Sequence, residues 1–465
     1  MNLKQYIQEI ENGKSIKEYY KYYKQKAKDD PYNAFVRLND FDINEEELKK
    51  TLLKWAAIWV KDIFLTKWYI TSCGSRMLEN YKSPYSSTVY ENMVKNWWVM
   101  LWKTNMDEFA MGSSTETSYF WLTKNSVDPT KVPWWSSWGS AAAVAWDLCL
   151  AALWTDTWGS IRQPASLCWV VWFKPTYGTN SRYGITAMAS SLDQAWTLTK
   201  TVEDAVILSK AIASYDENDA TSIDRKDIYT WEEALKKEII KWIKIAVPKE
   251  FLWEWLQKWV KDSIIDAIEK AKELWAEVEE VSMSLLKHAL EVYYIIMPAE
   301  VSTNLGRFDG IKYGYGKNTF DFPSIESYYS EVRKEWFWQE AKRRILLWTY
   351  VLSAGAYEKY YGKAQKVRKL IKNEFDKIFK DYDLIIWPTS PMTAWGLWEK
   401  TDDPLKMYLA DIYTVPVNLA WLPAMSLPVK KASDTNLPVW LHIIADQFKE
   451  DKMFQFANVL EKAYK

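Results

Sequence analysis

Two short stretches decide how this chain is interpreted: Pro133-Trp134-Trp135-Ser136-Ser137-Trp138-Gly139-Ser140 and Asp156-Thr157-Trp158-Gly159-Ser160-Ile161-Arg162. Both place tryptophan beside serine and glycine, in a setting where a tight backbone turn calls for glycine. With each tryptophan replaced by glycine, the stretches become P-G-G-S-S-G-G-S and D-T-G-G-S-I-R. Such loops have a bare backbone that a reacting group can approach closely.

The composition of the whole chain shows the same imbalance. It has 465 residues, with thirty tryptophans and only fourteen glycines. Only the two together reach the glycine share of an ordinary globular protein, roughly 7%. A residue with a Cβ costs about 1–2 kcal/mol in the left-handed region, and ten such sites would match the roughly 5–15 kcal/mol by which a domain is stable.

We therefore hypothesise that the source organism reads UGA as glycine, and that these thirty codons have been translated as tryptophan. All thirty positions tolerate glycine, including Trp169 and Trp172 in C-W-V-V-W-F-K-P-T-Y-G and Trp421 in L-A-W-L-P. The alternative is a genuine tryptophan-rich core.

Bulk properties bound the class of protein. Sixty basic and sixty-one acidic residues give a net charge of −1, so the chain carries no electrostatic footprint for a phosphate backbone. Residues 1–10 predict an amphipathic helix without the features of a signal peptide, and no run of 18 apolar residues occurs. A cytoplasmic protein is expected. Cys73, Cys149 and Cys168 are widely spaced and suggest neither a disulfide framework nor a metal site.

The pattern along the chain alternates between helical and strand-like segments. Helical spacing covers 2–28, 44–54, 202–213, 254–275, 284–298, 325–353, 357–380 and 449–463, with a helix start at 104–108 and a small-residue helix at 141–145. Strand-like segments lie at 56–60, 99–101, 243–247, 383–387, 424–429 and 438–445. This alternation predicts an α/β fold. No linker divides the chain, so we expect one catalytic domain over 56–465 after a helical N-terminal element over 1–55.

The chain is poor in the residue that most often serves as a catalytic base. Its two histidines, His288 and His442, have no neighbouring Ser-Asp pattern. A lysine can activate a serine if burial lowers its pKa toward neutrality. Lys61 follows the apolar run 56–60 directly and is the candidate base.

The two opening stretches resemble the amidase signature family. In that family two serines stand 24 positions apart, as Ser136 and Ser160 do here. The resemblance implies a Ser-cisSer-Lys triad in which Ser160 is the nucleophile, Ser136 is a bridging serine with a cis peptide bond, and Lys61 is the neutral base. It also implies a large mixed β-sheet covered by helices on both faces.

Further residues of the opening stretches take roles by the same resemblance. Ser137 would support the serine loop and contribute to the substrate site. The backbone N–H groups of Thr157, Trp158, Gly159 and Ser160 would form the oxyanion hole. A Cβ in that segment would obstruct the approach of the carbonyl group, so tryptophan at 158 is the most damaging of the thirty.

Other segments narrow the resemblance to one branch of the family, the glutaminase chains of glutamyl-tRNA(Gln)/aspartyl-tRNA(Asn) amidotransferases. They are K-T-N-M-D-E-F-A-M-G-S-S-T-E-T-S at 103–118, N-L-G-R-F-D-G-I-K-Y-G at 304–314 and K-R-R-I at 342–345. The implied substrate is glutamine, with Arg344 on its α-carboxylate and Asp411 on its α-ammonium group. Arg343 is the alternative to Arg344. Further lining candidates are Tyr293 or Tyr294, Ser113, Ser114 and Thr115.

The resemblance also implies that this chain works in a heterotrimer. Ammonia released here would pass to a B-type partner, where ATP and Mg²⁺ support amidation of misacylated Glu-tRNA(Gln) or Asp-tRNA(Asn), and a small C-type partner would hold the other two chains together. No cofactor is expected in this chain itself. The main alternative is a stand-alone amidase acting on another small amide. A catalytically silent scaffold is the interpretation if the tryptophans are genuine.

The codon hypothesis predicts a specific peptide. Trypsin cleavage after Lys131 and Arg162 releases residues 132–162. In protein isolated from its own host, mass spectrometry should find glycine at 134, 135, 138 and 158. Intact indoles at these four positions would refute the hypothesis.

Overall fold

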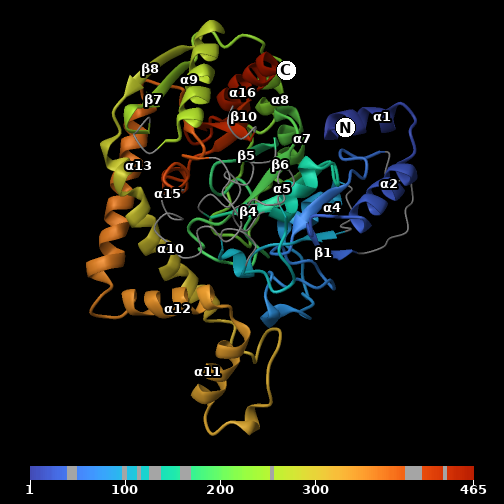
Figure 1. Ribbon diagram of the computed structural model, residues 1–465, viewed down its shortest axis with the longest axis vertical. Coiled ribbons are helices and arrows are strands. Elements are labelled where there is room, and N and C mark those ends of the chain that lie inside the picture. Colours follow the sequence, from blue (N-terminus) through green and yellow to red (C-terminus); the bar gives the residue numbers. More distant parts are fainter. Residues whose placement is uncertain are drawn as a thin grey trace.

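The computed structural model describes residues 1–38, 50–96, 102–112, 117–124, 138–157, 169–251, 256–392, 411–432 and 437–465. Figure 1 shows how the elements in these ranges are arranged.

Among the described residues, eleven strands form one mixed sheet. In sheet order they are β1 (Phe35–Leu38), β3 (Trp102–Thr104), β2 (Ile58–Lys61), β4 (Ala151–Asp156), β6 (Gln194–Thr199), β5 (Val171–Lys174), β10 (Ala424–Lys431), β11 (Pro438–Ala445), β9 (Leu384–Pro388), β7 (Lys244–Pro248) and β8 (Glu277–Val281). Pairing is parallel across β3-β2-β4 and β9-β7-β8, and antiparallel from β4 to β9. The predicted α/β class with a large mixed sheet is confirmed.

Thirteen α-helices are described. They are α1 (Leu3–Glu11), α2 (Ile16–Lys28), α4 (Thr88–Lys95), α5 (Trp138–Ala145), α7 (Val202–Ile212), α8 (Thr230–Leu235), α9 (Lys258–Glu273), α10 (Ala289–Leu305), α11 (Ile325–Trp336), α12 (Gln339–Val351), α13 (Lys363–Ile378), α15 (Val415–Leu419) and α16 (Glu450–Tyr464). Helices α7, α8 and α16 pack on one another, α10 packs on α12 and α13, and α11 lies apart from the sheet (Figure 1). None of the described helices is long and apolar enough to span a membrane.

The small-residue helix predicted at 141–145 is α5, and it packs against β4 and β2. Close packing explains its composition. A Cβ on Gly139 would lie 2.3 Å from the carbonyl oxygen of Ala34 and 2.6 Å from the amide nitrogen of Asn105. Only glycine fits there. Ser140 Oγ lies 2.8 Å from Thr104 Oγ1, which fixes α5 to the end of β3.

Several predicted elements differ from the structure. Residues 2–28 form two helices because Gly13 takes a φ of 96° and the Ser15 side chain caps the second helix. Residues 325–353 are likewise divided at Phe337, whose backbone is extended. The helix start predicted at 104–108 is wrong, since only a short 3-10 turn, η2 (Glu108–Ala110), forms. Residues 50–54 are turns and not helix, while 44–49 and 99–101 lie outside the described residues.

Some strands gave no clear signal in the sequence. β4, β5 and β6 are buried along their whole length and therefore lack alternation between apolar and polar residues. Segment 1–55 contributes the edge strand β1 as well as two helices. The boundary at 55/56 stays a prediction.

Tryptophan occupies an unusual share of the left-handed backbone positions. Thirteen described residues other than glycine have positive φ, and six of them are tryptophan: Trp55, Trp68, Trp169, Trp242, Trp275 and Trp421. Their φ values lie between 52° and 75°. This is the region that glycine enters at little steric cost and that a Cβ disfavours.

Two of these tryptophans stand at the C′ position of a Schellman motif, where glycine is the usual residue. After α9, the N–H groups of Trp275 and Ala276 donate to the carbonyls of Lys272 and Ala271. The same pattern follows α15 at Trp421. The matching motif after α1 uses Gly13. Among the described residues this local geometry is thus filled by glycine at Gly13, by aspartate at Asp147 after α5, and by tryptophan twice.

Buried indoles add a second inconsistency. Within the described residues, the indole N–H groups of Trp154, Trp231, Trp336 and Trp440 are buried and meet no hydrogen-bond acceptor. An unsatisfied buried donor costs about 1–3 kcal/mol. Both observations favour glycine over tryptophan at these positions.

We expect Trp275→Gly and Trp242→Gly each to raise the free energy of unfolding by about 1 kcal/mol, because both residues have positive φ. Both indoles are also mostly exposed, so little packing is lost. Trp338→Gly is the matched control, since Trp338 is exposed but has a φ of −65°. Urea denaturation measures the change. Equal effects at all three positions would contradict the strain argument.

Candidate active site

Lys61 ends the strand β2, which lies between β3 and β4 and is parallel to both. All four residues of β2 are buried, as the apolar run before Lys61 predicted. The side chain of Lys61 has no solvent exposure. Its amine therefore sits inside the protein at the carboxyl end of a strand in a parallel segment of the sheet.

The surroundings of Lys61 favour a neutral amine. Its Nζ lies 3.3 Å from Thr155 Oγ1 and 4.3 Å from the centre of the Trp154 ring. Burial lowers the pKa of Lys61 to about 7, and the negative charges of Asp107, Asp156 and Asp193 oppose this shift. An amine with that pKa is largely able to accept a proton near neutral pH.

The end of β4 is held by hydrogen bonds on both sides. Asn418 donates to Asp156 Oδ1 at 2.8 Å. Thr157 Oγ1 donates to Asp193 Oδ1 at 2.6 Å, and the backbone N–H groups of Met188 and Ala189 donate to the other oxygen of Asp193. Burial raises the pKa of Asp193 to about 7. Thr157 is thus fixed directly before the segment that was predicted to carry the nucleophile.

The remaining residues of that prediction lie outside the described residues. They are Ser136, Ser137, Trp158, Gly159 and Ser160. Their roles as bridging serine, loop support, oxyanion hole and nucleophile stay predictions, as does the cis peptide bond at Ser136. The lining candidates Ser113, Ser114 and Thr115 also fall outside.

The two residues predicted to bind an amino acid are both buried. Arg344 lies on α12, 5% exposed, with Nη1 at 3.9 Å from Met297 Sδ, whereas its neighbour Arg343 is exposed. Asp411 is fully buried and accepts a hydrogen bond from the Tyr294 hydroxyl at 2.9 Å. Of the two candidate arginines, the structure therefore places Arg344 inside.

The tyrosine that the sequence left undecided has a partner beside it. Tyr293 is buried, and burial raises its pKa well above the usual value. Its hydroxyl feels the charges of Arg344, Asp411 and Asp156. Asp156 also acts on Lys61. Tyr293 on α10 is therefore close to the arginine, the aspartate and the end of β4, and the half-buried Tyr294 beside it bonds to the aspartate.

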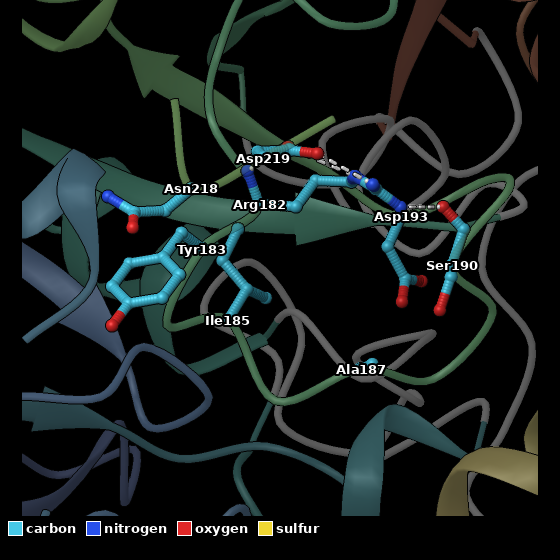
Figure 2. Close-up of a pocket in the computed structure, with 8 residues that line it drawn as sticks. All are labelled: Arg182, Tyr183, Ile185, Ala187, Ser190, Asp193, Asn218 and Asp219. Carbon is cyan, nitrogen blue, oxygen red and sulfur yellow. Dashed lines mark hydrogen bonds and ion pairs between the residues drawn. The ribbon is translucent and has the colours of Figure 1, made fainter. Parts of the chain in front are cut away.

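Asp193 also lines a cavity of about 160 Å³ (Figure 2). Arg182 crosses it and donates through Nε and Nη2 to Asp219, and through Nη1 to the carbonyl oxygen of Ser190. Because these bonds engage each nitrogen of the guanidinium, Arg182 stabilises the wall of the cavity. We assign no ligand to it.

Sequence reasoning missed a second buried lysine. Lys103 on β3 lies beside Val60 of β2 and is 1% exposed. Its Nζ donates to the carbonyl oxygen of Phe64 and to Thr71 Oγ1, and lies 3.9 Å from Asp62 Oδ1. Burial lowers its pKa to about 8, against the effect of Asp62. The motif that begins at Lys103 was used only for the resemblance, although a lysine at a buried strand position was a usable signal.

Comparison with known proteins gives consistent results. The family model described as Amidase matches residues 26–454. Two curated relatives are each named as the A-type chain of glutamyl-tRNA(Gln) amidotransferase. The protein from Thermodesulfovibrio yellowstonii is 49% identical over 89% of this chain and 84% of its own length. That from Halothermothrix orenii is 46% identical over 94% of this chain and 90% of its own length.

Solved structures show the same relationship. The structure of the A-type chain of glutamyl-tRNA(Gln) amidotransferase from Thermotoga maritima aligns with a TM-score of 0.77 and 40% identity, covering 93% of this chain and 87% of that one. A crystal structure described as an amidase aligns over the full length of both chains with a TM-score of 0.77 and 26% identity.

We expect amide hydrolysis to rise with pH through about 7, because Lys61 accepts a proton only when neutral and its pKa is lowered to about 7. Lys61→Met should reduce kcat by about 10²–10⁴-fold with the fold intact. Rates measured from pH 5.5 to 9 check both points.

Lys103→Met is the matched control for this experiment. It leaves Asp62 buried without its cation and should lower the free energy of unfolding by about 3–5 kcal/mol. The remaining activity should keep the same rise near pH 7. A rise that disappears with Lys103 instead of Lys61 would show that the base is misassigned.

Proposed function

Because this chain belongs to the amidase family, we propose that it is the glutamine-hydrolysing subunit of a tRNA-dependent amidotransferase. Its substrate is free glutamine and its products are glutamate and ammonia. One observation carries the choice of glutamine over other amides. A buried cation, Arg344, and a buried anion, Asp411, both influence the buried Tyr293, and Asp411 accepts a hydrogen bond from Tyr294 beside it.

A buried cation and a buried anion in one site match the two charges of a free amino acid. A guanidinium binds a carboxylate in two parallel hydrogen bonds, and a carboxylate accepts from an ammonium group. An amino acid with a free α-carboxylate and a free α-ammonium group satisfies both residues at once. A simple amide would use neither of them.

The proposed chemistry begins at the neutral amine of Lys61. It takes a proton through Ser136 from the hydroxyl of Ser160, and Ser160 attacks the side-chain amide carbon of glutamine. The backbone N–H groups of residues 157–160 stabilise the oxyanion. The tetrahedral intermediate breaks its C–N bond, the nitrogen leaves as ammonia with the proton that Lys61 had taken, and water then hydrolyses the glutamyl ester.

The partners are proposed by analogy with the relatives, whose name describes them as one part of a larger assembly. Ammonia would pass to a B-type partner that uses ATP and Mg²⁺ to amidate Glu-tRNA(Gln) or Asp-tRNA(Asn) in the cytoplasm, and a C-type partner would join the two. Two features of this chain support a partner. Its net charge of −1 gives no general affinity for tRNA. Leu346, Leu347 and Tyr350 on α12 are mostly exposed, as expected of a surface that contacts another protein.

A stand-alone amidase of the same family remains the second candidate. It would purify without partners and would not need Arg344. Isolation of the chain from its own host, followed by identification of whatever co-purifies, separates the two cases.

The amino-acid pocket yields a direct prediction. Arg344→Ala should raise the KM for glutamine about ten- to hundredfold, because a charge-assisted hydrogen-bond pair is lost. It should not change the hydrolysis of propionamide, which has no α-carboxylate. Arg343→Ala is the matched control, since that side chain is exposed. Equal loss on both substrates, or none on glutamine, would contradict the proposed pocket.

A further inference from the structure

Glu108 is a buried carboxylate that joins two separate parts of the molecule. It is 4% exposed. Its Oε1 accepts from the Ser75 hydroxyl at 2.6 Å, and its Oε2 accepts from the backbone N–H of residue 338 at 2.8 Å. Burial raises the pKa of Glu108 to about 7, although both hydrogen bonds oppose the shift. Burial of this carboxylate is unfavourable, and its two hydrogen bonds offset part of that cost.

On one side Glu108 belongs to the loop beside the catalytic lysine. It begins η2 and directly follows Asp107, the acidic residue with the largest effect on the pKa of Lys61. Asp107 Oδ1 accepts from the Thr117 hydroxyl at 2.6 Å, and the N–H of Phe109 donates to the carbonyl of Cys73 at 2.8 Å. The loop is therefore held in place around Asp107.

On the other side Glu108 reaches the start of α12. Residue 338 is the N-cap of this helix, and its own side chain makes no capping bond. The Phe109 ring lies 5.7 Å from the ring of Phe337, so the loop touches the helix start at two adjacent points. The bond from Glu108 goes to the backbone. It therefore does not depend on whether residue 338 is tryptophan or glycine.

Arg344 lies six residues after this anchor, about 9 Å along the helix. α12 is held along one narrow face: Ala341, Arg344 and Val351 are buried, whereas Leu346, Leu347 and Tyr350 are exposed. This face packs on α10, and the bond from residue 338 to Glu108 fixes the N-terminal end of the helix. A shift at residue 338 would be carried to Arg344, because a helix moves as a rigid unit.

We propose that Glu108 is a positioning residue for glutamine, which ties the loop beside Lys61 to the start of α12 and so sets where the guanidinium of Arg344 meets the substrate. This inference rests on the proposed function. The distance between Lys61 and the guanidinium of Arg344 then depends on this one carboxylate bridge.

The first test compares Glu108→Ala with Glu108→Gln in the complex isolated with its partners. Alanine leaves the N–H of residue 338 and the Ser75 hydroxyl without their acceptor. The KM for glutamine should rise about tenfold, with kcat changed less than about threefold. In Glu108→Gln, the new side-chain amide can accept from the N–H of residue 338 and donate to Ser75 Oγ. This variant should therefore restore the KM for glutamine. An unchanged KM in Glu108→Ala overturns the proposal.

The second test removes the donor and leaves Glu108 in place. Residue 338 has a φ of −65°, and Phe337 before it is extended, so proline fits both positions. Trp338→Pro deletes both the indole and the N–H, whereas Trp338→Ala deletes the indole and keeps the N–H, so the two variants differ in the N–H. Proline should raise the KM as Glu108→Ala does, and alanine should not. The reverse result, or equal effects, overturns the proposal.

Two controls separate positioning from general damage. Asp204→Ala removes another buried carboxylate, which accepts from the backbone of Lys4, and it should lower stability without moving the KM. Glu108→Ala should leave propionamide hydrolysis unchanged. An equal loss on glutamine and propionamide would mean a structural role only and would overturn the inference.

Arg344→Ala is measured in parallel. If its KM for glutamine is unchanged, the proposed function fails. If it rises while Glu108→Ala and Trp338→Pro do not raise theirs, the pocket stands and the bridge fails.

Discussion

The rest of the candidate site depends on the burial of one amine, that of Lys61. Lys61 ends a strand that is covered on both edges by parallel neighbours, so its charge cannot reach water. Removing a lysine from water favours its neutral form. Lys103, one strand away, is just as deeply buried but has Asp62 at 3.9 Å, and its pKa falls less, to about 8 against about 7. Asp107, Asp156 and Asp193 raise the pKa of Lys61, but they do not offset the effect of its burial. The lower pKa of Lys61 supports its proposed role as the base, whereas Lys103 lies beside Asp62.

Buried carboxylates hold together the elements that meet near the amine of Lys61. Asp193 fixes Thr157 at the end of β4 with three donors, and Glu108 connects the loop beside Lys61 to α12. Asp411 accepts a hydrogen bond from the hydroxyl of Tyr294 on α10. Each of these acids is buried, and each has a specific donor from a different part of the chain. A half-satisfied carboxylate in such a place is costly, so these bonds favour a single arrangement of the surrounding elements. The site is therefore organised by polar contacts inside an otherwise apolar core.

Sequence reasoning reached the parts of this site that follow from local patterns or from resemblance. The apolar run before Lys61 predicted its buried strand end, and the α/β alternation predicted the fold class. Resemblance pointed to Arg344 and Asp411, and the structure shows both buried near the same tyrosines. It could not find Glu108, because the partner of that side chain is 230 residues away and is a backbone group. Strands such as β5 and β6 were missed because they are buried throughout, and each contains a tryptophan that disturbs the pattern.

The tryptophans with left-handed backbones bear on how any preparation of this protein is judged. At Trp275 and Trp421 the left-handed backbone with which the chain leaves a helix favours glycine. A recombinant gene written with ordinary tryptophan codons would install thirty indoles in every molecule, several of them at such exits. Low activity or low solubility of that product would result from the tryptophans that the laboratory host inserts. It would carry no information about the competence of the enzyme.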